Sequence, residues 1–371
     1  MKLKNHKLFL REGGYRMKCN NGKYALMTVT SMGVRIIPTD RQPVHTSDTF
    51  LMTATSAESN VLNVSASLGL PVKVLTKFVE GSVIAAFIKR KLRERGIEYE
   101  GKEVPQGDAW GYRHQFNIAD NGFGLRGPRV QNDRAGEVGR TLNAGDYDLK
   151  RLFEDEGCKI LHLSGLIAAL SPETGRCCVE VARAAKKAGT LISFDLNYRA
   201  SFWKNREEEL YGIFNEIASL ADILIGNEED FQLALRIPGP ETEGKNVSKI
   251  DSFKEMIGKV SEKYPNGTVF ATTLRQVLNA NTHMWGSVML ADGKWYHEEP
   301  REIQVYDRIG GGDGFVSGLL YGIVQGWEYE KCMQFGWGTG AMAATVQEDY
   351  ASPLDEEQVW SIYKGNARVK R

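Results

Sequence analysis

The chain has 371 residues, of which 42% are hydrophobic and 25% are charged, and its 47 basic residues balance its 47 acidic ones. This is the composition of an ordinary globular protein, and a formal net charge of zero gives no overall field that would favour nucleic acid or an anionic membrane. No apolar run approaches the roughly 20 residues of a membrane helix, and the five cysteines form no CxxC pair. We therefore expect a cytoplasmic protein with reduced thiols.

The first part of the chain predicts a mixture of strands and helices. After an N-terminal extension over 1–22, a β-branched run over 23–38 predicts a first strand, and a second strand is expected over 72–78. Apolar spacing predicts helices over 56–68 and 82–96. Residues 109–130 alternate aromatic and polar side chains around Asn121-Gly122, which predicts a β-hairpin.

From the hairpin onward, strand and helix patterns alternate regularly. Strands are expected to end near His162, Asp195 and Gly226, with a further strand over 268–272, and helices are expected over 173–188, 207–220 and 251–264. This rhythm favours a parallel sheet covered by helices on both faces. The hairpin-rich segments before it suggest a small β element added to the sheet.

Three consecutive glycines follow Asp307 where a predicted strand gives way to a predicted helix. A helix start presents unpaired backbone N–H groups to an anion, and Gly310, Gly311 and Gly312 would let the backbone approach a phosphate closely. Asp313 follows them. Its carboxylate could take the proton of an attacking hydroxyl, or it could simply cap the helix, and the residues alone leave both interpretations open.

Two other nucleotide-binding motifs are the alternatives to this glycine turn. The Walker pattern GxxxxGK[ST] does not occur in the sequence. Residues 336–341 fit the dinucleotide pattern GxGxxA, but they follow a predicted helix instead of a strand. Close helix packing is the better interpretation of those glycines.

The stretch VYDRIGGGDGFVSG resembles the second signature, DTxGAGDxFxxG, of the ribokinase-like (PfkB) carbohydrate kinases. Four further segments are similar to the 2-keto-3-deoxygluconate kinases of that family, namely 161–171, 193–199, 224–230 and 271–275. The resemblance implies a ribokinase-like α/β fold, a three-layer sandwich with a central, mainly parallel sheet. The kinase domain would span 23–371, with a small β lid from about 39–53 and 107–134.

The resemblance also implies roles for individual residues. Asp313 would be the catalytic base, and Gly310, Gly311 and Gly312 would form the anion hole. The residues expected at ATP are Asn227, Thr273, Arg275, Gly312 and Gly338, and those expected to hold Mg²⁺ through water are Asn227 and Asp230. The alternative to a metal-binding role for Asn227–Asp230 is a simple helix start, which explains this stretch equally well. The alternative for Arg275 is an ordinary arginine on the protein surface.

On the substrate side the resemblance points to Arg199 and Arg134, together with Asn60 and Ser56. A guanidinium suits the carboxylate of a sugar acid. The sequence departs from the family here, because Thr55-Ser56 replaces a glycine pair and Thr30-Ser31 replaces Gly-Glu. Both changes would narrow or repolarise the sugar pocket.

These features together predict an ATP-dependent kinase of a sugar or sugar acid, with 2-keto-3-deoxygluconate as the first candidate substrate. The alternatives are a related kinase for fructose, ribose or a nucleoside, and a catalytically silent sugar-binding relative. A NAD-dependent oxidoreductase is disfavoured because no GxGxxG follows the first predicted strand. The resemblance further implies a homodimer that binds a small molecule, and the balanced charge predicts no nucleic-acid or membrane partner.

Overall fold

The computed structural model describes residues 17–239 and 249–368 and contains two β-sheets. The large sheet has nine strands in the order β13-β12-β11-β10-β9-β8-β1-β4-β5. Their bounds are β1 Tyr24–Val29, β4 Val72–Val79, β5 Glu98–Val104, β8 Cys158–Ser164, β9 Leu191–Asp195, β10 Ile223–Ile225, β11 Val269–Asn279, β12 Thr282–Ala291 and β13 Lys294–Gln304. Every neighbouring pair from β5 to β11 is parallel, whereas β12 and β13 continue the sheet antiparallel. The expected mainly parallel sheet is confirmed.

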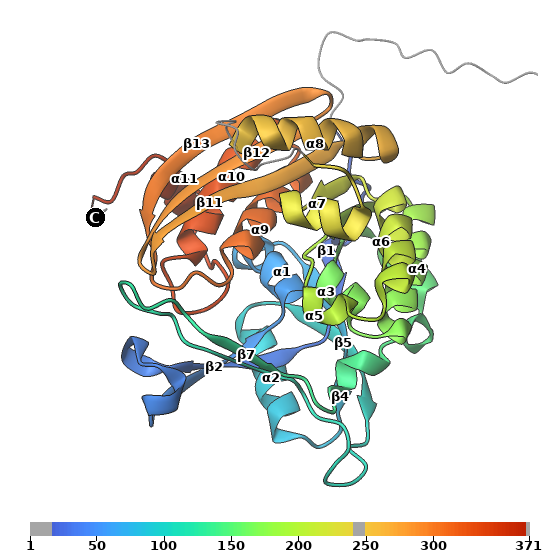
Figure 1. The fold of residues 1–371 in the computed structure, drawn as a ribbon. Helices are drawn as coiled ribbons and strands as arrows, with labels where there is room; N and C mark the ends of the chain where they lie inside the picture. Colours follow the sequence, from blue (N-terminus) through green and yellow to red (C-terminus); the bar gives the residue numbers. More distant parts are fainter. Residues whose placement is uncertain (1–16, 240–248, 369–371) are drawn as a thin grey trace, which may run out of the picture.

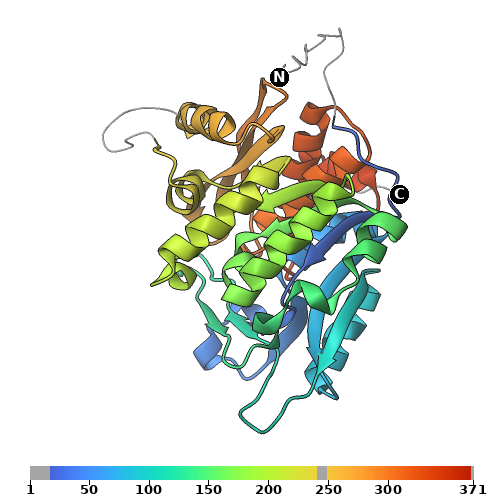
Figure 2. The same ribbon diagram turned by 90° about the vertical axis from the view of Figure 1, so that its right-hand side faces the viewer.

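Helices cover both faces of this sheet (Figure 1). The helices that pack with the first hydrophobic cluster are α3 Gly165–Ala169, α4 Pro172–Lys187, α6 Glu207–Leu220, α7 Glu228–Leu235 and α8 Lys249–Lys263. Those that pack with the second are α1 Ala57–Ser67, α2 Val83–Glu94, α9 Gly311–Val324 and α10 Tyr329–Ala343. Two short helices complete the set, α5 Ala200–Trp203 and α11 Glu356–Tyr363. In Figure 2 the green and yellow-green helices lie in front of the sheet.

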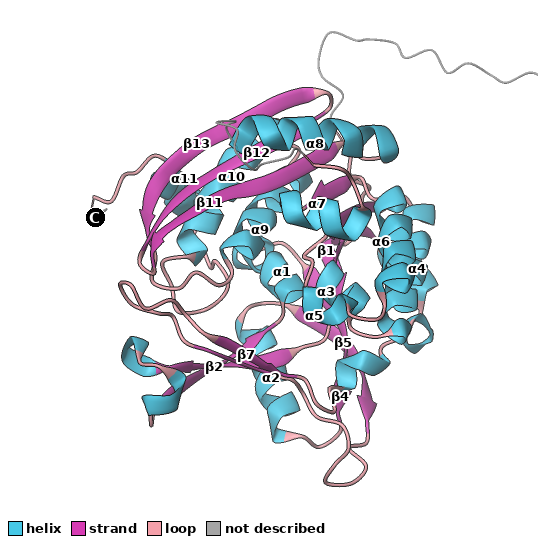
Figure 3. Cartoon of the chain, in the orientation of Figure 1, coloured by secondary structure: helices cyan, strands magenta, loops and turns pink. Residues whose placement is uncertain are grey.

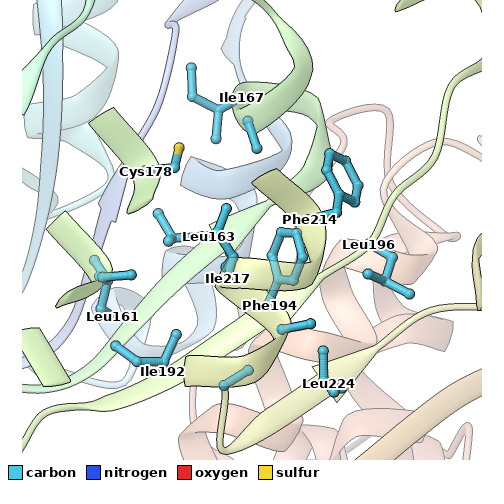
Figure 4. Close-up of a cluster of buried hydrophobic side chains, with 14 of the residues drawn as sticks. Leu161, Leu163, Ile167, Cys178, Ile192, Phe194, Leu196, Phe214, Ile217 and Leu224 are labelled. Atoms are coloured by element: carbon cyan, nitrogen blue, oxygen red, sulfur yellow. The ribbon is translucent and has the colours of Figure 1, made fainter. Parts of the chain in front are cut away.

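The two-residue period of a strand explains why one sheet supports two cores. In β8, Leu161 and Leu163 belong to the first cluster, whereas Ile160 belongs to the second. Figure 4 shows the strand residues of the first cluster beside Phe214 and Ile217 of α6. Parallel strands buried on both faces therefore appear in the sequence as continuous apolar runs.

The small sheet has four strands in the order β3-β2-β6-β7, and we call it the lid. Its strands are β2 Gly33–Pro38, β3 Phe50–Thr55, β6 Phe116–Ala119 and β7 Val130–Asp133. Figure 3 shows β2 and β7 apart from the large sheet.

Two sequence expectations about the lid need correction. The run over 23–38 is not one strand, because the chain leaves the large sheet after Val29 and enters the lid at Gly33. A β-carbon on Gly33 would lie 2.4 Å from Gln115 Nε2, so the side chain of Gln115 packs directly against the backbone at this crossing. The hairpin predicted over 109–130 contains β6 but only the first residue of its antiparallel partner β7, and the loop 120–129 joins them in place of a tight turn at Asn121-Gly122.

Most of the proposed extension over 1–22 lies outside the described residues. Its last part lies against α10, since the backbone N–H of Met17 donates to Tyr329 Oη at 3.1 Å. No helix within 17–239 and 249–368 has both the length and the apolar character to cross a bilayer.

Candidate active site

A cleft of about 730 Å³ is lined by lid residues and by the carboxyl ends of parallel strands. Asp195 ends β9, Asn227 follows β10, and Thr273 lies in β11, and all three line the cleft together with Asn117 and Asn132 of the lid. Ligands of open α/β sheets bind at this edge. The fold therefore brings the predicted site segments together.

The glycine turn forms one wall of the cleft, at the start of α9. Gly310 is the residue before the helix and has φ +86°, and a β-carbon there would lie 2.0 Å from the carbonyl oxygen of Asp349. Gly310 and Gly312 line the cleft, whereas Gly311 faces Trp285. The first backbone N–H groups of α9 have no partner within the helix and are available to an anion.

Asp313 is the third residue of α9, and it also lines the cleft. Asn60 Nδ2 donates to Asp313 Oδ2 at 3.0 Å. Desolvation raises the pKa of Asp313 to about 7, and the charges of Asp349 and Glu58 act in the same direction against Asn60 and Arg199. The helix cap is Gly310 and makes no side-chain bond, so Asp313 is not the capping residue.

Asp195 is a cleft carboxylate that the sequence analysis did not single out. Desolvation raises its pKa well above the ordinary value, and the charges of Asp230 and Asp313 raise it further. Three carboxylates therefore crowd this part of the cleft. Asp195 lies within 193–199, one of the segments similar to 2-keto-3-deoxygluconate kinases. That similarity could have marked Asp195 as a candidate site residue.

Asn227 and Asp230 form a capping box at the start of α7. Asn227 Oδ1 accepts from Asp230 N at 2.8 Å, while Asp230 Oδ2 accepts from Asn227 N at 2.8 Å and Oδ1 accepts from Tyr198 N at 2.9 Å. Both residues also line the cleft. In the part of the chain that the structure describes, no group of three or more His, Cys, Asp or Glu side chains is arranged to hold a metal ion.

Another part of the cleft lining, at the end of β11 and in the glycine turn, is basic. Arg275 and Arg308 line it with Thr273, and desolvation together with the Arg308 charge lowers the pKa of Arg275. Neither guanidinium has an acidic partner among the described residues. Two unneutralised guanidinium groups suit a polyphosphate. Arg308 was not assigned a role from the sequence, although it lies in the signature itself.

Gly338 does not line the cleft, contrary to the expectation for a nucleotide-binding residue. It is buried in α10, where a β-carbon would lie 2.9 Å from Val359 Cγ1 of α11. Gly336 and Gly340 pack against α9 in the same way, with β-carbons 2.8 Å from Phe315 O and 2.9 Å from Gly311 O. Close helix packing accounts for these glycines.

The two predicted substrate arginines have different surroundings. Arg199 is exposed in the cleft and donates to the carbonyl of its neighbour Tyr198 at 2.7 Å. Arg134 Nη1 donates to both carboxylate oxygens of the buried Glu137, at 2.9 and 3.0 Å. The charge of Arg134 is thus already neutralised, and nothing in the sequence pattern signalled Glu137.

The hydroxyl residues that replace family glycines do lie at the cleft. Ser56 accepts from Ser59 N at 3.1 Å and so begins α1, and Thr55 donates to Asp349. Both line the cleft. Asn60 is also there, but its amide serves Asp313.

The replacement for Gly-Glu is equally well accommodated. Thr30 Oγ1 donates to Glu58 Oε2 at 2.5 Å, and Ser31 Oγ donates to Glu137 Oε1 at 2.5 Å. Ser164 of β8 also donates to Glu58. Each of these hydroxyls donates to a buried carboxylate, and Ser31 and Glu58 also line the cleft.

Comparison with known proteins places these features in context. The sequence profile of the pfkB family carbohydrate kinases matches residues 148–356. A 5-dehydro-2-deoxygluconokinase of Clostridium perfringens is 26% identical over 323 residues, covering 86% of this chain and 87% of that protein. A 2-dehydro-3-deoxygluconokinase of Bacillus subtilis is 26% identical over 329 residues, covering 88% and 91%. The crystal structure of the 2-dehydro-3-deoxygluconokinase of Thermotoga maritima matches with a TM-score of 0.83 and 25% identity, over 92% of this chain and 99% of that one.

Proposed function

The chain belongs to the pfkB family of carbohydrate kinases and is a phosphotransferase, and on that premise we propose that it transfers the γ-phosphoryl group of ATP to a hydroxyl of a sugar acid. The observation that carries the proposal is Asp313, which lies beside the glycine turn in a cleft and has a pKa of about 7. A general base is most effective when its pKa lies near the working pH. The first candidate acceptor is 2-keto-3-deoxygluconate.

In the proposed mechanism Asp313 removes the proton of the acceptor hydroxyl as its oxygen attacks the γ-phosphorus of ATP. The bond between that phosphorus and the β,γ-bridging oxygen breaks, and ADP leaves. Asn60 holds the carboxylate of Asp313 through its 3.0 Å hydrogen bond. The N–H groups at the start of α9, after Gly310, stabilise the charge on the transferred phosphoryl group. Arg275, Arg308 and Thr273 bind the other phosphates.

Magnesium fits the acidic part of the cleft through water. The pKa of Asp195 is raised by its acidic neighbours, and a divalent cation would relieve that repulsion. Both oxygens of Asp230 already accept backbone N–H groups, so Asp230 and Asn227 would act through bound water, as Mg²⁺ readily allows. When bound, Mg²⁺ neutralises phosphate charge.

Arg199 is the residue that we propose for the carboxylate of the acceptor, because its guanidinium is exposed in the cleft and donates to the carbonyl of the neighbouring Tyr198 instead of to a carboxylate. Arg134 would bind hydroxyl or carbonyl oxygens, since Glu137 balances its charge. Asn132 and Ser56 add uncharged polar groups to the same end of the cleft. The names of the relatives, which are kinases of dehydro-deoxy sugar acids, support an acid acceptor.

A neutral sugar is the second candidate acceptor. The pairing of Arg134 with Glu137 favours it, because the substrate end then carries one free guanidinium instead of two. Thr55 and Ser56 also occupy space that glycines would leave open.

A coupled assay of ATP consumption distinguishes these candidates. The panel comprises 2-keto-3-deoxygluconate, 5-keto-2-deoxygluconate, fructose, ribose and a nucleoside, and we expect the highest kcat/KM with a sugar acid. Asp313→Asn should lower kcat by roughly 10²–10⁴-fold while ATP still binds. Asp155→Asn, an exposed control, should leave kcat unchanged. Lack of stimulation by any acceptor would favour a silent sugar-binding protein.

We also propose that the chain forms a homodimer through the lid and works in the cytoplasm. The edge strands β3 and β7 of the lid leave backbone groups for pairing with a second chain. The free cysteines fit a reducing compartment.

A further inference from the structure

The lid strand β2 carries a fully buried arginine. The side chain of Arg35 is 0% exposed, and its Nη2 donates to Oδ2 of Asp307, whose side chain is also 0% exposed. Arg35 Nη1 lies 3.8 Å from Asp349 Oδ1, in a side chain that is 5% exposed. Burying an arginine costs several kcal/mol unless carboxylates compensate for the lost water. The two aspartates supply that compensation from outside the lid.

The same two aspartates, Asp307 and Asp349, both contact the glycine turn. Asp307 Oδ1 accepts the backbone N–H of Ile309 at 2.9 Å, which is inside the turn. The backbone of Asp349 lies so close to Gly310 that a β-carbon there would be 2.0 Å from its carbonyl oxygen. Both aspartates thus contact the turn directly, Asp307 through a hydrogen bond and Asp349 through its backbone.

The lid makes two further contacts with this pair. Asn121 Nδ2, from the β6–β7 loop, donates to Asp307 Oδ2 at 2.7 Å, and Thr55 Oγ1, at the end of β3, donates to Asp349 Oδ2. Three separate lid segments thus converge on the two carboxylates. The position of the lid and the position of the turn are set by one network.

Part of this network lacks hydrogen-bond partners. Arg35 Nε and Nη1 and Asp349 Oδ1 are buried and make no hydrogen bond within the described structure. Buried polar atoms are nearly always paired. Arg35 and Asp349 therefore interact as an ion pair at 3.8 Å without a hydrogen bond, whereas Arg35 and Asp307 are hydrogen-bonded.

We propose that Arg35 is a positioning residue for phosphoryl transfer: its guanidinium joins the lid strand β2 to Asp307 and Asp349, fixes the glycine turn and balances the carboxylates behind it. This rests on the proposed kinase function, because the turn that Arg35 positions is the one assigned to the phosphoryl group. The lid and the phosphate site then form one unit.

The charges around Asp313 give the proposal a readout that a purely structural ion pair would not change. The charged groups that act on Asp313 come from α1, from β9 and the loop after it, and from the loop after α10: Glu58, Asp195, Arg199 and Asp349. Arg35→Met removes the positive charge that lies 3.8 Å from Asp349, while Arg95, which also interacts electrostatically with Asp349, remains. The acidic limb of the pH profile of kcat should therefore move to higher pH. Asp349→Asn removes a charge that raises the pKa of Asp313, so its acid limb should move to lower pH.

The kinetic test compares Arg35→Met, Arg35→Lys and a matched control, Lys77→Met. Lys77 Nζ lies 2.8 Å from Asp146 Oδ2 in another buried ion pair, and neither residue lines the cleft. We expect Arg35→Met to lower kcat by roughly 10²-fold, the scale of a misplacement of about 1 Å. Arg35→Lys should restore the acid limb but only part of kcat, since an ammonium lacks the planar fork. Lys77→Met should lower Tm and leave kcat and the acid limb unchanged.

Hydrogen exchange of the segment 305–315 provides a test that does not depend on turnover. Exchange there should rise in Arg35→Met and remain at the wild-type level in Lys77→Met. If the wild-type protein phosphorylates no acceptor, the kinase function fails and the exchange result still decides the role of Arg35. Folded Arg35→Met with wild-type kcat, acid limb and exchange would overturn the proposal. If Arg35→Met does not fold, the Asp349→Asn variant provides the test. A wild-type kcat and a wild-type acidic limb of the pH profile in Asp349→Asn would then overturn the proposed role of Arg35.

Discussion

Asp313 binds its proton more tightly than an ordinary aspartate because the cleft desolvates its carboxylate and places Asp349 and Glu58 nearby. Asn60 and Arg199 oppose this effect by stabilising the charged form. The balance gives a carboxylate that changes protonation state near neutral pH. Such a carboxylate would accept a proton readily and is still about half ionised at pH 7, as the proposed role of a general base requires.

A pH profile of kcat/KM tests this property directly. Since the carboxylate must be deprotonated to act as a base, activity should be full above a pKa of about 7 and fall about tenfold per pH unit below it. The profile should be measured from pH 5 to 9 under conditions in which the wild-type protein stays folded. A rate that is constant down to pH 5 would contradict the assignment of Asp313 as the base.

Glu137 determines how much positive charge the substrate end of the cleft presents. Glu137→Gln keeps an oxygen acceptor for Arg134 and Ser31 but removes the charge that neutralises Arg134. We expect KM for sugar acids to fall roughly tenfold, which is about 1.4 kcal/mol, while KM for neutral sugars stays the same.

The measurement for Glu137→Gln is the ratio of KM values for an acid and a neutral acceptor in the variant and in the wild-type protein. The variant should also be less stable by about 1–3 kcal/mol, because a buried charged partner is lost. An unchanged KM ratio in the folded variant would show that Arg134 does not contact the acceptor.

At the scale of elements, the contact between α9 and α10 depends on glycines. A β-carbon on Gly318 would lie 2.1 Å from Thr339 Oγ1, and one on Gly336 would lie 2.8 Å from Phe315 O. The two helix backbones therefore approach closely. This contact bears on the proposed function because α9 carries Asp313 in its first turn, directly after the glycine turn.

Gly336→Ala tests this close contact. The added methyl group meets a backbone oxygen, so we expect a loss of about 1–3 kcal/mol in the free energy of unfolding through overpacking. Gly212→Ala is the matched control, because Gly212 lies in α6 and a β-carbon there would have no neighbour within 4 Å in the described structure. It should gain about 0.5–1 kcal/mol through helix propensity. Denaturant unfolding measures both, and equal stabilities for the two variants would contradict the packing explanation.

At the scale of the whole molecule, the regular second half of the chain was predictable, because each buried strand and amphipathic helix has its own local signal. The helix expected over 207–220 has these bounds in the structure. The run over 23–38 was mispredicted as one strand because both of its strands are apolar and buried. Local pattern does not reveal that they belong to different sheets.

The position of the candidate site was predictable where a motif marks it, since Gly310, Gly312 and Asp313 line the cleft at the start of α9. It was not predictable where function depends on contacts between distant segments. Asp349 lies 36 residues after Asp313, in no recognised motif, and reaches the turn only through the fold. Gly338 shows the opposite error, because its motif position suggested a ligand although α11 fills the space beside it.

The lid also bears on how the whole molecule assembles. Large apolar side chains are exposed in its β6–β7 loop, where Phe123 is 62% and Leu125 is 98% exposed, and such groups favour association. We expect light scattering to give twice the 41.4 kDa of one chain. Replacing both residues by serine should raise the dimer dissociation constant at least tenfold, since each buried side chain contributes about 1.5–3 kcal/mol.

The control is Leu354→Ser, at a site that is 83% exposed and outside the lid. This change should leave the dimer dissociation constant unchanged. A wild-type protein that is monomeric at all concentrations would exclude a lid-mediated dimer, and equal effects of the two changes would assign association to general hydrophobicity instead of to the lid.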